Sequence, residues 1–177
     1  MSDLKNKNVL MIIAHREFRD EELLRPKKIF EGAGANVVIA STSLTPATGM
    51  FGAKATPNIL LKDADINKYD AVIFVGGSGS EVYFGDPTAH SIAKNAHAAN
   101  KIIGAICIAP GILANAGILK GRKATIWAGD TKYVNVLRGN NVNYTGEAVT
   151  KDGKIITANG PEAAEQFGND IAKAINN

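Results

Sequence analysis

KIIGAICIAPGILANAG, residues 101–117, passes from branched apolar residues through Cys107 into a helical pattern. The apolar run is typical of a buried strand. Pro110 suits the first turn of a helix, where its missing N–H leaves no hydrogen bond unmade. The small residues Ala105 and Ala109 allow a tight turn between strand and helix, of the kind called a nucleophile elbow. We therefore predict that Cys107 lies at such a turn.

The thiol of Cys107 would then lie at the N-terminus of a helix. The positive end of the helix dipole favours the thiolate, which is the nucleophilic form of cysteine. The alternative is a buried structural cysteine that behaves as a small apolar residue. The predicted turn and the glycine-rich segment 76–80 favour a reactive thiol.

The composition is that of an ordinary globular chain, with 45% hydrophobic and 21% charged residues. We predict a single domain over residues 1–177, a length that allows a sizeable core. The net charge of +3 is dispersed and does not favour a nucleic-acid partner. No apolar run approaches the roughly 20 residues that span a bilayer, so no membrane partner is expected. The polar N-terminus and the single cysteine favour a reducing cytoplasm.

Apolar runs alternate with helical patterns along the chain, which predicts an α/β fold with a mainly parallel sheet covered on both faces. The predicted strands are 8–14, 36–40, 71–75, 101–107, 124–127, 142–149 and 154–158. The predicted helices are 20–32, 87–99, 110–116, 130–137 and a last one from residue 161. Turn residues within 45–62 predict a small hairpin. Asp20 and Asp130 are the expected caps of their helices.

Ligands of such sheets bind beyond the C-terminal ends of the strands. Three segments would meet there: residues 15–22 after the first strand, the glycine-rich segment 76–80, and the turn at Cys107. Segment 76–80 lacks the Lys-Ser/Thr ending of a phosphate-binding loop and the spacing of a dinucleotide fingerprint. We interpret it as a tight turn whose N–H groups point into the pocket.

Four motifs of this chain together resemble the ThiJ/PfpI superfamily, which includes PfpI-type intracellular proteases and protein deglycases. The motifs are EFRDEELLRP (17–26), VIFVGG (72–77), AICIAP (105–110) and ITANGPE (156–162). Their order and spacing match almost the whole chain. The resemblance implies a flavodoxin-like three-layer sandwich, no metal or organic cofactor, and assembly as a homodimer or higher homo-oligomer.

The resemblance also implies roles for particular residues. Cys107 would be the nucleophile, and Glu22, four residues before Pro26, would be the glutamate of the family. Backbone N–H groups of Gly77 and Ile108 would form the oxyanion pocket. Protease-type members carry a histidine directly after the cysteine, where this chain has Ile108. A second histidine of some members falls near Trp127, so this chain is more similar to the deglycase-like branch.

Spacing alone leaves Glu22 open, because a helix-start carboxylate is usually exposed and Glu21 could fill the same role. Pro26, however, cannot donate a hydrogen bond to the Glu22 carbonyl, and the helix is expected to be distorted there. We hypothesise a partly buried, protonated Glu22 that donates a hydrogen bond to the thiolate. Burial raises the pKa of a carboxyl group.

Four further residues are candidates for binding substrate: Gly76, His15, Arg19 and Trp127. His15 could supply a base, or it could be an exposed loop histidine. Arg19 could orient an anionic substrate, or it could be solvated. Trp127 would be pocket wall or core. The histidines and acidic residues show no spacing typical of a metal site.

The sequence therefore predicts a cofactor-independent cysteine enzyme, a lyase or hydrolase. The resemblance implies glyoxalase III or protein deglycase chemistry on reactive dicarbonyls such as methylglyoxal, or on glycated proteins. Cys107 would add to an aldehyde, and Glu22 would move protons. One alternative is a PfpI-type cysteine peptidase or amidase. Another is a redox-sensing stress chaperone whose Cys107 is oxidised to sulfinic acid.

Overall fold

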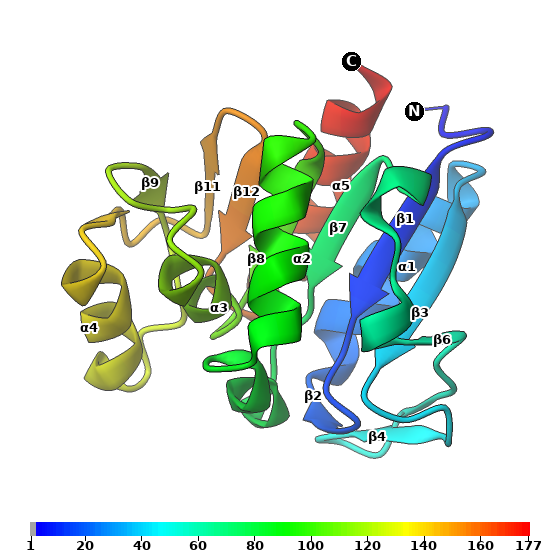
Figure 1. Ribbon diagram of the computed structural model, residues 1–177, viewed down its shortest axis with the longest axis horizontal. Helices are drawn as coiled ribbons and strands as arrows, with labels where there is room; N and C mark the ends of the chain where they lie inside the picture. Colours follow the sequence, from blue (N-terminus) through cyan, green and yellow to red (C-terminus); the bar gives the residue numbers. More distant parts are fainter. Residues whose placement is uncertain (1–2) are drawn as a thin grey trace.

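A seven-stranded sheet runs through the centre of the computed structural model, which describes residues 3–177 (Figure 1). The strand order is β11-β12-β8-β7-β1-β3-β6, and every pairing is parallel except that of β11 with β12. The strands are β1 (Asn8–Ile12), β3 (Asn36–Ser41), β6 (Ile59–Leu60), β7 (Ala71–Phe74), β8 (Ile102–Ile106), β11 (Val149–Asp152) and β12 (Ile155–Ala158).

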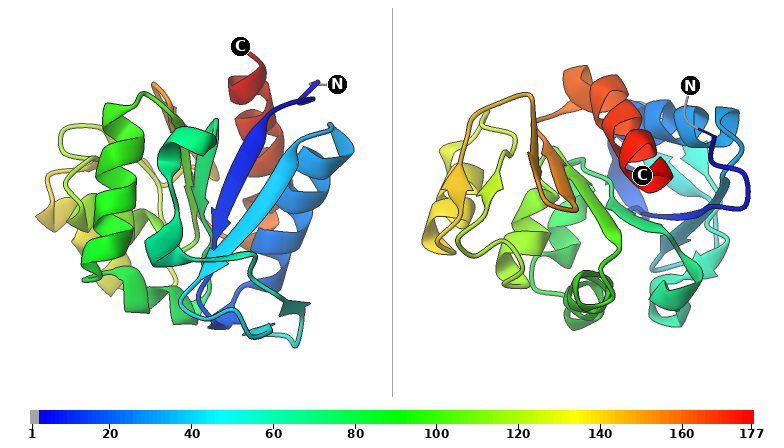
Figure 2. Two further views of the ribbon diagram at one scale, coloured as in Figure 1. Left: turned by 45° about the vertical axis from the view of Figure 1, so that its right-hand side comes forward. Right: turned by 90° about the horizontal axis from the view of Figure 1, so that it is seen from above.

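Helices cover both faces of this sheet, as Figure 2 shows in the view from above. The α-helices are α1 (Asp20–Gly32), α2 (Pro87–Ala98), α3 (Pro110–Asn115), α4 (Thr131–Gly139) and α5 (Ala164–Asn176). α1 and α5 pack together on one face, and α2 and α3 cover the other with α4 against α3. Short 3-10 helices are η1 (Leu61–Asp63), η2 (Ile66–Lys68), η3 (Ser78–Tyr83) and η4 (Pro161–Ala163). The predicted α/β sandwich with a mainly parallel sheet is confirmed.

The buried strands explain why this fold forms. β1, β7, β8 and β12 consist almost wholly of apolar residues with no polar face. Such strands require cover on both sides, which parallel crossovers with helices supply. The described residues contain no helix that is long and apolar enough to cross a membrane.

Two predicted strands are wrong in part. Segment 124–127 forms only the two-residue strand β9 (Lys123–Ala124), which pairs with β10 (Asn143–Tyr144) outside the main sheet. The predicted strand 142–149 is split between β10 and β11. Gly146 lies between them with φ 73°, a left-handed conformation that interrupts an extended strand.

A three-stranded sheet beside the C-terminal ends of the strands was predicted in part. The hairpin within 45–62 exists as β4 (Ala47–Gly49) and β5 (Lys54–Ala55). β2 (Arg16–Phe18) pairs with β4 and was not predicted. Three residues are too few to show an alternating apolar pattern.

The contact between β8 and α5 leaves no room for a side chain at Gly104. A Cβ atom there would lie 2.7 Å from Ile171 Cδ1 and 2.9 Å from Phe167 Cζ. We expect Gly104→Val to lower the free energy of unfolding by about 1–3 kcal/mol, because the core has no room for the added atoms. Gly32→Ala is the control, since a Cβ there has no neighbour within 4 Å. Urea unfolding measures both, and a Gly104→Val variant as stable as wild type would contradict the packing described.

Candidate active site

The ends of β7 and β8 and the segment from β2 into α1 meet at one edge of the sheet. The Arg19 N–H donates to the Gly76 carbonyl at 2.9 Å. A Cβ atom on Gly77 would collide with the backbone of Glu17 and Arg19, and Gly77 has φ 104°. Only glycine therefore allows these two segments to touch. The structure brings together the three segments that the sequence predicted.

Cys107 follows β8 and is held in a rare conformation. Its φ is 63°, in the left-handed region, which is strained for a residue with a side chain. Its N–H donates to the Ala158 carbonyl and its own carbonyl accepts from the Trp127 N–H, both at 2.9 Å. The backbone N–H groups of Gly77 and Ile108 face the sulfur and stabilise a negative charge on it. The strained residue is thus fixed from both sides.

Glu22, in the first turn of α1, is fully buried. Within residues 3–177 its two carboxyl oxygens make no full hydrogen bond, and the polar groups that face them are the Cys107 thiol and the Gly76 backbone. Glu21, the alternative from the sequence, is instead partly exposed and paired with Arg19. The structure therefore places Glu22, and not Glu21, against the thiol.

Gly76 makes room for this contact. A Cβ atom on Gly76 would collide with the Glu22 carboxyl oxygen and with Cys107 Cβ, and would lie 2.6 Å from the Ile106 carbonyl oxygen. The missing side chain is the space in which the carboxyl group and the thiol meet. Gly76 therefore lies beneath the site as a spacer, where the sequence suggested a substrate-binding role.

The two acidic groups change each other's protonation. Burial raises the pKa of Glu22 to about 8. Burial and the charge of Glu22 raise the pKa of Cys107 to about 12, although the N–H groups of Gly77 and Ile108 act to lower it. Burial of the thiol and the charge of Glu22 thus override the lowering that was expected from a helix dipole.

These two groups titrate as a pair. Above about pH 8 the pair holds one proton. When that proton lies on Glu22, the carboxylate charge that opposes the thiolate is gone and the carboxyl can donate to sulfur. The pair can therefore present a thiolate beside a protonated acid, although the isolated thiol is a weak acid.

A pocket of about 350 Å³ opens onto Cys107. Its lining residues are Arg19, Met50, Gly77, Ser78, Cys107, Ile108, Trp127, Asp130, Tyr133 and Pro161. Trp127 is 38% exposed and its ring lies 5.8 Å from that of Tyr133, so it is pocket wall and not core. His15 does not line this pocket; its Nε2 lies 3.3 Å from Thr45 Oγ1. Larger hollows between α1 and α5 and beside α2 lie away from the thiol.

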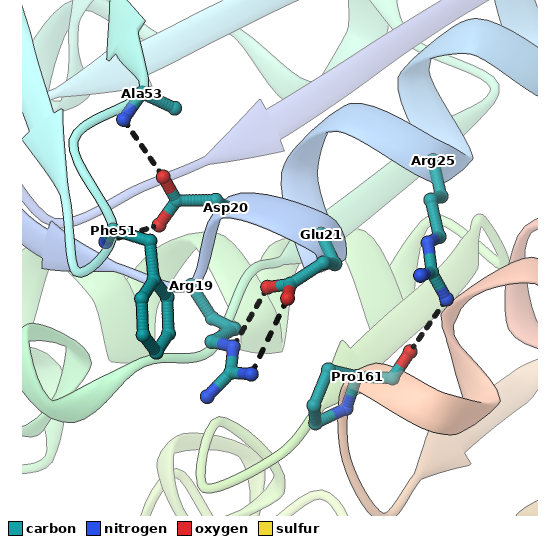
Figure 3. A network of polar contacts seen from close by, with 7 residues as sticks. All are labelled: Arg19, Asp20, Glu21, Arg25, Phe51, Ala53 and Pro161. Carbon is teal, nitrogen blue, oxygen red and sulfur yellow. Dashed lines mark hydrogen bonds and ion pairs between the residues drawn. The ribbon is translucent and has the colours of Figure 1, made fainter.

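No sequence pattern indicated Met50 or Tyr133 as residues of the site. Met50 belongs to the loop between β4 and β5, which Asp20 holds near the site: its carboxylate accepts N–H bonds from Phe51 at 3.0 Å and Ala53 at 2.7 Å (Figure 3). The prediction that Asp20 caps α1 is therefore wrong. Arg19 occupies the cap position, and its side chain makes no capping hydrogen bond to the backbone of the helix.

The prediction that Asp130 caps α4 is confirmed, since its side chain accepts the Lys132 N–H at 2.9 Å. Asp130 thereby helps to fix the start of the helix that carries Tyr133 into the pocket. Residues 3–177 contain no group of three or more His, Cys, Asp or Glu residues placed to hold a metal ion.

We expect Gly76→Ala to disrupt the pair without removing either group. The added methyl would displace the Glu22 carboxyl group or the main chain at Ile106. The rate of Cys107 alkylation by iodoacetamide should change at least about tenfold, with a loss of about 1–3 kcal/mol in stability. Gly85→Ala is the matched control, because a Cβ there has no neighbour within 4 Å. Wild-type alkylation at every pH in Gly76→Ala would show that the contact is unimportant.

The raised pKa of Glu22 predicts how stability depends on pH. Between the ordinary value of 4.5 and about 8 the folded chain keeps a proton that the unfolded chain has lost. The free energy of unfolding should therefore fall as the pH rises from 4.5 to about 8, by roughly 5 kcal/mol at most. Glu22→Gln should lack this decline. Parallel urea-unfolding curves of the two proteins across this range would refute the buried, protonated state.

Known proteins that resemble this chain match it over almost its whole length. A sequence model of the DJ-1/PfpI family matches residues 7–174. An uncharacterized protein of Methanocaldococcus jannaschii is 39% identical, over 98% of this chain and 84% of its own length. The crystal structure of a ThiJ/PfpI domain protein from Brachyspira murdochii is 34% identical with a TM-score of 0.91, and the match covers 97% of each chain.

A more distant structure shares the same fold. That of Drosophila melanogaster DJ-1beta is 26% identical with a TM-score of 0.86, and the match covers 99% of this chain and 91% of the other. The flavodoxin-like fold and the resemblance inferred from the four motifs are thus confirmed. The chain belongs to the DJ-1/PfpI family.

Proposed function

We propose that the Cys107 pocket converts reactive 2-oxo aldehydes, such as methylglyoxal, into 2-hydroxy acids, and that it also accepts their adducts on protein amines. The observation that carries this proposal is the buried Glu22 carboxyl group, whose one polar side-chain contact among residues 3–177 is the Cys107 thiol. Such a pair supplies a nucleophile and a proton carrier without a metal or cofactor.

The reaction begins with addition of sulfur to the aldehyde carbon. In the pair that holds a single proton, this proton moves from the thiol to the Glu22 carboxylate, the C–S bond forms, and the aldehyde oxygen takes up the proton from Glu22. The product is a hemithioacetal. Charge that develops on the oxygen is stabilised by the N–H groups of Gly77 and Ile108, which already face the sulfur.

Internal proton transfers then oxidise the carbon bonded to sulfur and reduce the neighbouring carbonyl carbon. The Glu22 carboxylate removes the hydrogen from the carbon bonded to sulfur and passes the proton to the oxygen of the neighbouring carbonyl, which gives an enediol. It then takes the hydroxyl proton of the carbon bonded to sulfur and delivers it to the neighbouring carbon, so that the hemithioacetal becomes a 2-hydroxy thioester. Water hydrolyses the thioester and regenerates the thiol. The sum is dicarbonyl plus water to 2-hydroxy acid, with no external oxidant.

The pKa of Glu22 suits this role. A group that must both take and give a proton works best when its pKa is near the working pH, and burial raises that of Glu22 to about 8. A peptidase needs a base that can protonate a leaving amine. His15 and His90 contact Thr45 and the Phe84 carbonyl, and no histidine in residues 3–177 lines the pocket. No observation favours the peptidase.

We expect lactate to form from methylglyoxal with wild-type protein and not with Cys107→Ser. Glu22→Gln should lower kcat/KM by about 10²–10⁴, because the amide can no longer carry the proton. Glu165→Gln removes an exposed carboxylate of α5 that does not line the Cys107 pocket, and should retain full activity. Lactate is measured by an enzyme-coupled assay.

Three results would count against the proposal. Full activity in Glu22→Gln would show that Glu22 is not the proton carrier. Absence of lactate, with two oxygens gained by Cys107 in peroxide by mass spectrometry, would favour the redox-sensing alternative. Casein turnover by wild type but not by Cys107→Ser would instead favour the peptidase.

A further inference from the structure

Arg19 is the one cationic side chain among the residues that line the Cys107 pocket, within the described part of the chain. We propose that Arg19 binds a carboxylate of the substrate, so that this pocket prefers anionic electrophiles, and among 2-oxo aldehydes those that carry a carboxylate beyond the two carbonyl carbons. The preference for anions stands on the geometry of Arg19. Its application to 2-oxo aldehydes rests on the function proposed above.

Arg19 is fixed before any ligand arrives. Its Nε lies 2.7 Å from Glu21 Oε2 and its Nη2 lies 3.3 Å from Glu21 Oε1 (Figure 3). Its Cζ lies 4.6 Å from the centre of the Phe51 ring, and Asp20 holds the Phe51 backbone. The Arg19 N–H bonds to the Gly76 carbonyl beside the thiol. Ordering this side chain therefore costs little when a ligand binds.

The guanidinium group keeps free donors. It has five N–H bonds, and Glu21 takes one from Nε and one from Nη2. The end formed by Nη1 and the second hydrogen of Nη2 makes no bond to Glu21, and Figure 3 shows a guanidinium nitrogen of Arg19 pointing away from Glu21. This planar pair of donors matches the two oxygens of a carboxylate.

Neighbouring charges limit the attraction to short range. Glu21 neutralises much of the Arg19 charge, and Asp130 places a second carboxylate on the pocket wall. Glu22 lies behind the thiol and also acts on Arg19. A free anion in solution would thus feel a weak field. The preference for a substrate carboxylate must therefore come from direct hydrogen bonds to the free end of the Arg19 guanidinium.

Iodoacetate and iodoacetamide test this contact without turnover. In both reactions the Cys107 thiolate attacks the CH₂ carbon, the C–I bond breaks and iodide leaves with the electron pair. The two reagents have nearly the same size and differ in charge. The ratio of their rate constants therefore cancels any change in the thiol itself and reports the effect of the carboxylate.

We expect Arg19→Gln to lower the iodoacetate to iodoacetamide ratio about tenfold, the effect of one charge-assisted hydrogen bond. Glu21→Gln should raise the ratio, because it removes the competing charge and keeps an acceptor for Nε. A merely structural role for Glu21 would not raise it. Arg16→Gln is the matched control, since Arg16 is exposed on β2 and outside the pocket, and its ratio should equal that of wild type.

An unchanged ratio in Arg19→Gln, or an equal fall in Arg16→Gln, would overturn the proposal. The substrate arm compares kcat/KM for 4,5-dioxopentanoate with that for methylglyoxal, and the preference for the anion should be lost in Arg19→Gln. If neither dicarbonyl reacts but the alkylation ratio behaves as expected, the proposed function fails and the anion contact stands. If both react with no difference between wild type and Arg19→Gln, the anion contact fails alone.

Discussion

The burial of one carboxyl group against one thiol is the constraint on which the site depends. Glu22 is fully buried and has no full hydrogen-bond partner among residues 3–177, so its charged form is disfavoured and its proton stays within reach of Cys107. Three features exist to allow that contact. Gly76 leaves space for it, Gly77 lets the β2–α1 segment touch the β7 loop, and the left-handed Cys107 turns its side chain out of β8. Replacing the buried acid by an apolar residue would relieve the cost of burial, which is why we read the acid as functional.

The fold stabilises a local arrangement that would not form by itself. The strained backbone at Cys107 is held by hydrogen bonds from two other segments, the end of β12 and the chain after β9. Strain of this kind persists only where surrounding structure over-determines the conformation, and it gathers at functional sites. The apolar strands β7, β8 and β12 supply that rigidity, because their neighbours on both faces are helices packed into two separate cores. Cys107 thus follows a strand that is packed on both faces of the sheet.

The sequence predicted what local patterns encode. Branched apolar runs indicated the parallel strands, and the small residues around Cys107 indicated the turn. It could not predict β2, whose three residues have no pattern of their own, nor that Asp20 would hold the β4–β5 loop instead of capping α1, because that depends on a loop 30 residues away. The direction of the Cys107 pKa also failed. The sequence suggested a helix dipole, but burial of the thiol and the charge of Glu22, which both depend on tertiary packing, raise the pKa instead.

Residues 19–22 show why neighbouring acids at a helix start are not equivalent. Successive residues of an α-helix project about 100° apart, so three consecutive carboxylates must face three different surroundings. Asp20 faces the β4–β5 loop, Glu21 turns back to the Arg19 guanidinium, and Glu22 enters the core toward the thiol. From spacing alone Glu21 and Glu22 could exchange roles. In the structure they cannot, because a helix rotated by one residue would bury Glu21 and its arginine partner and would expose Leu23, which is fully buried. The packing of α1 on the sheet therefore decides which carboxyl group reaches the cysteine.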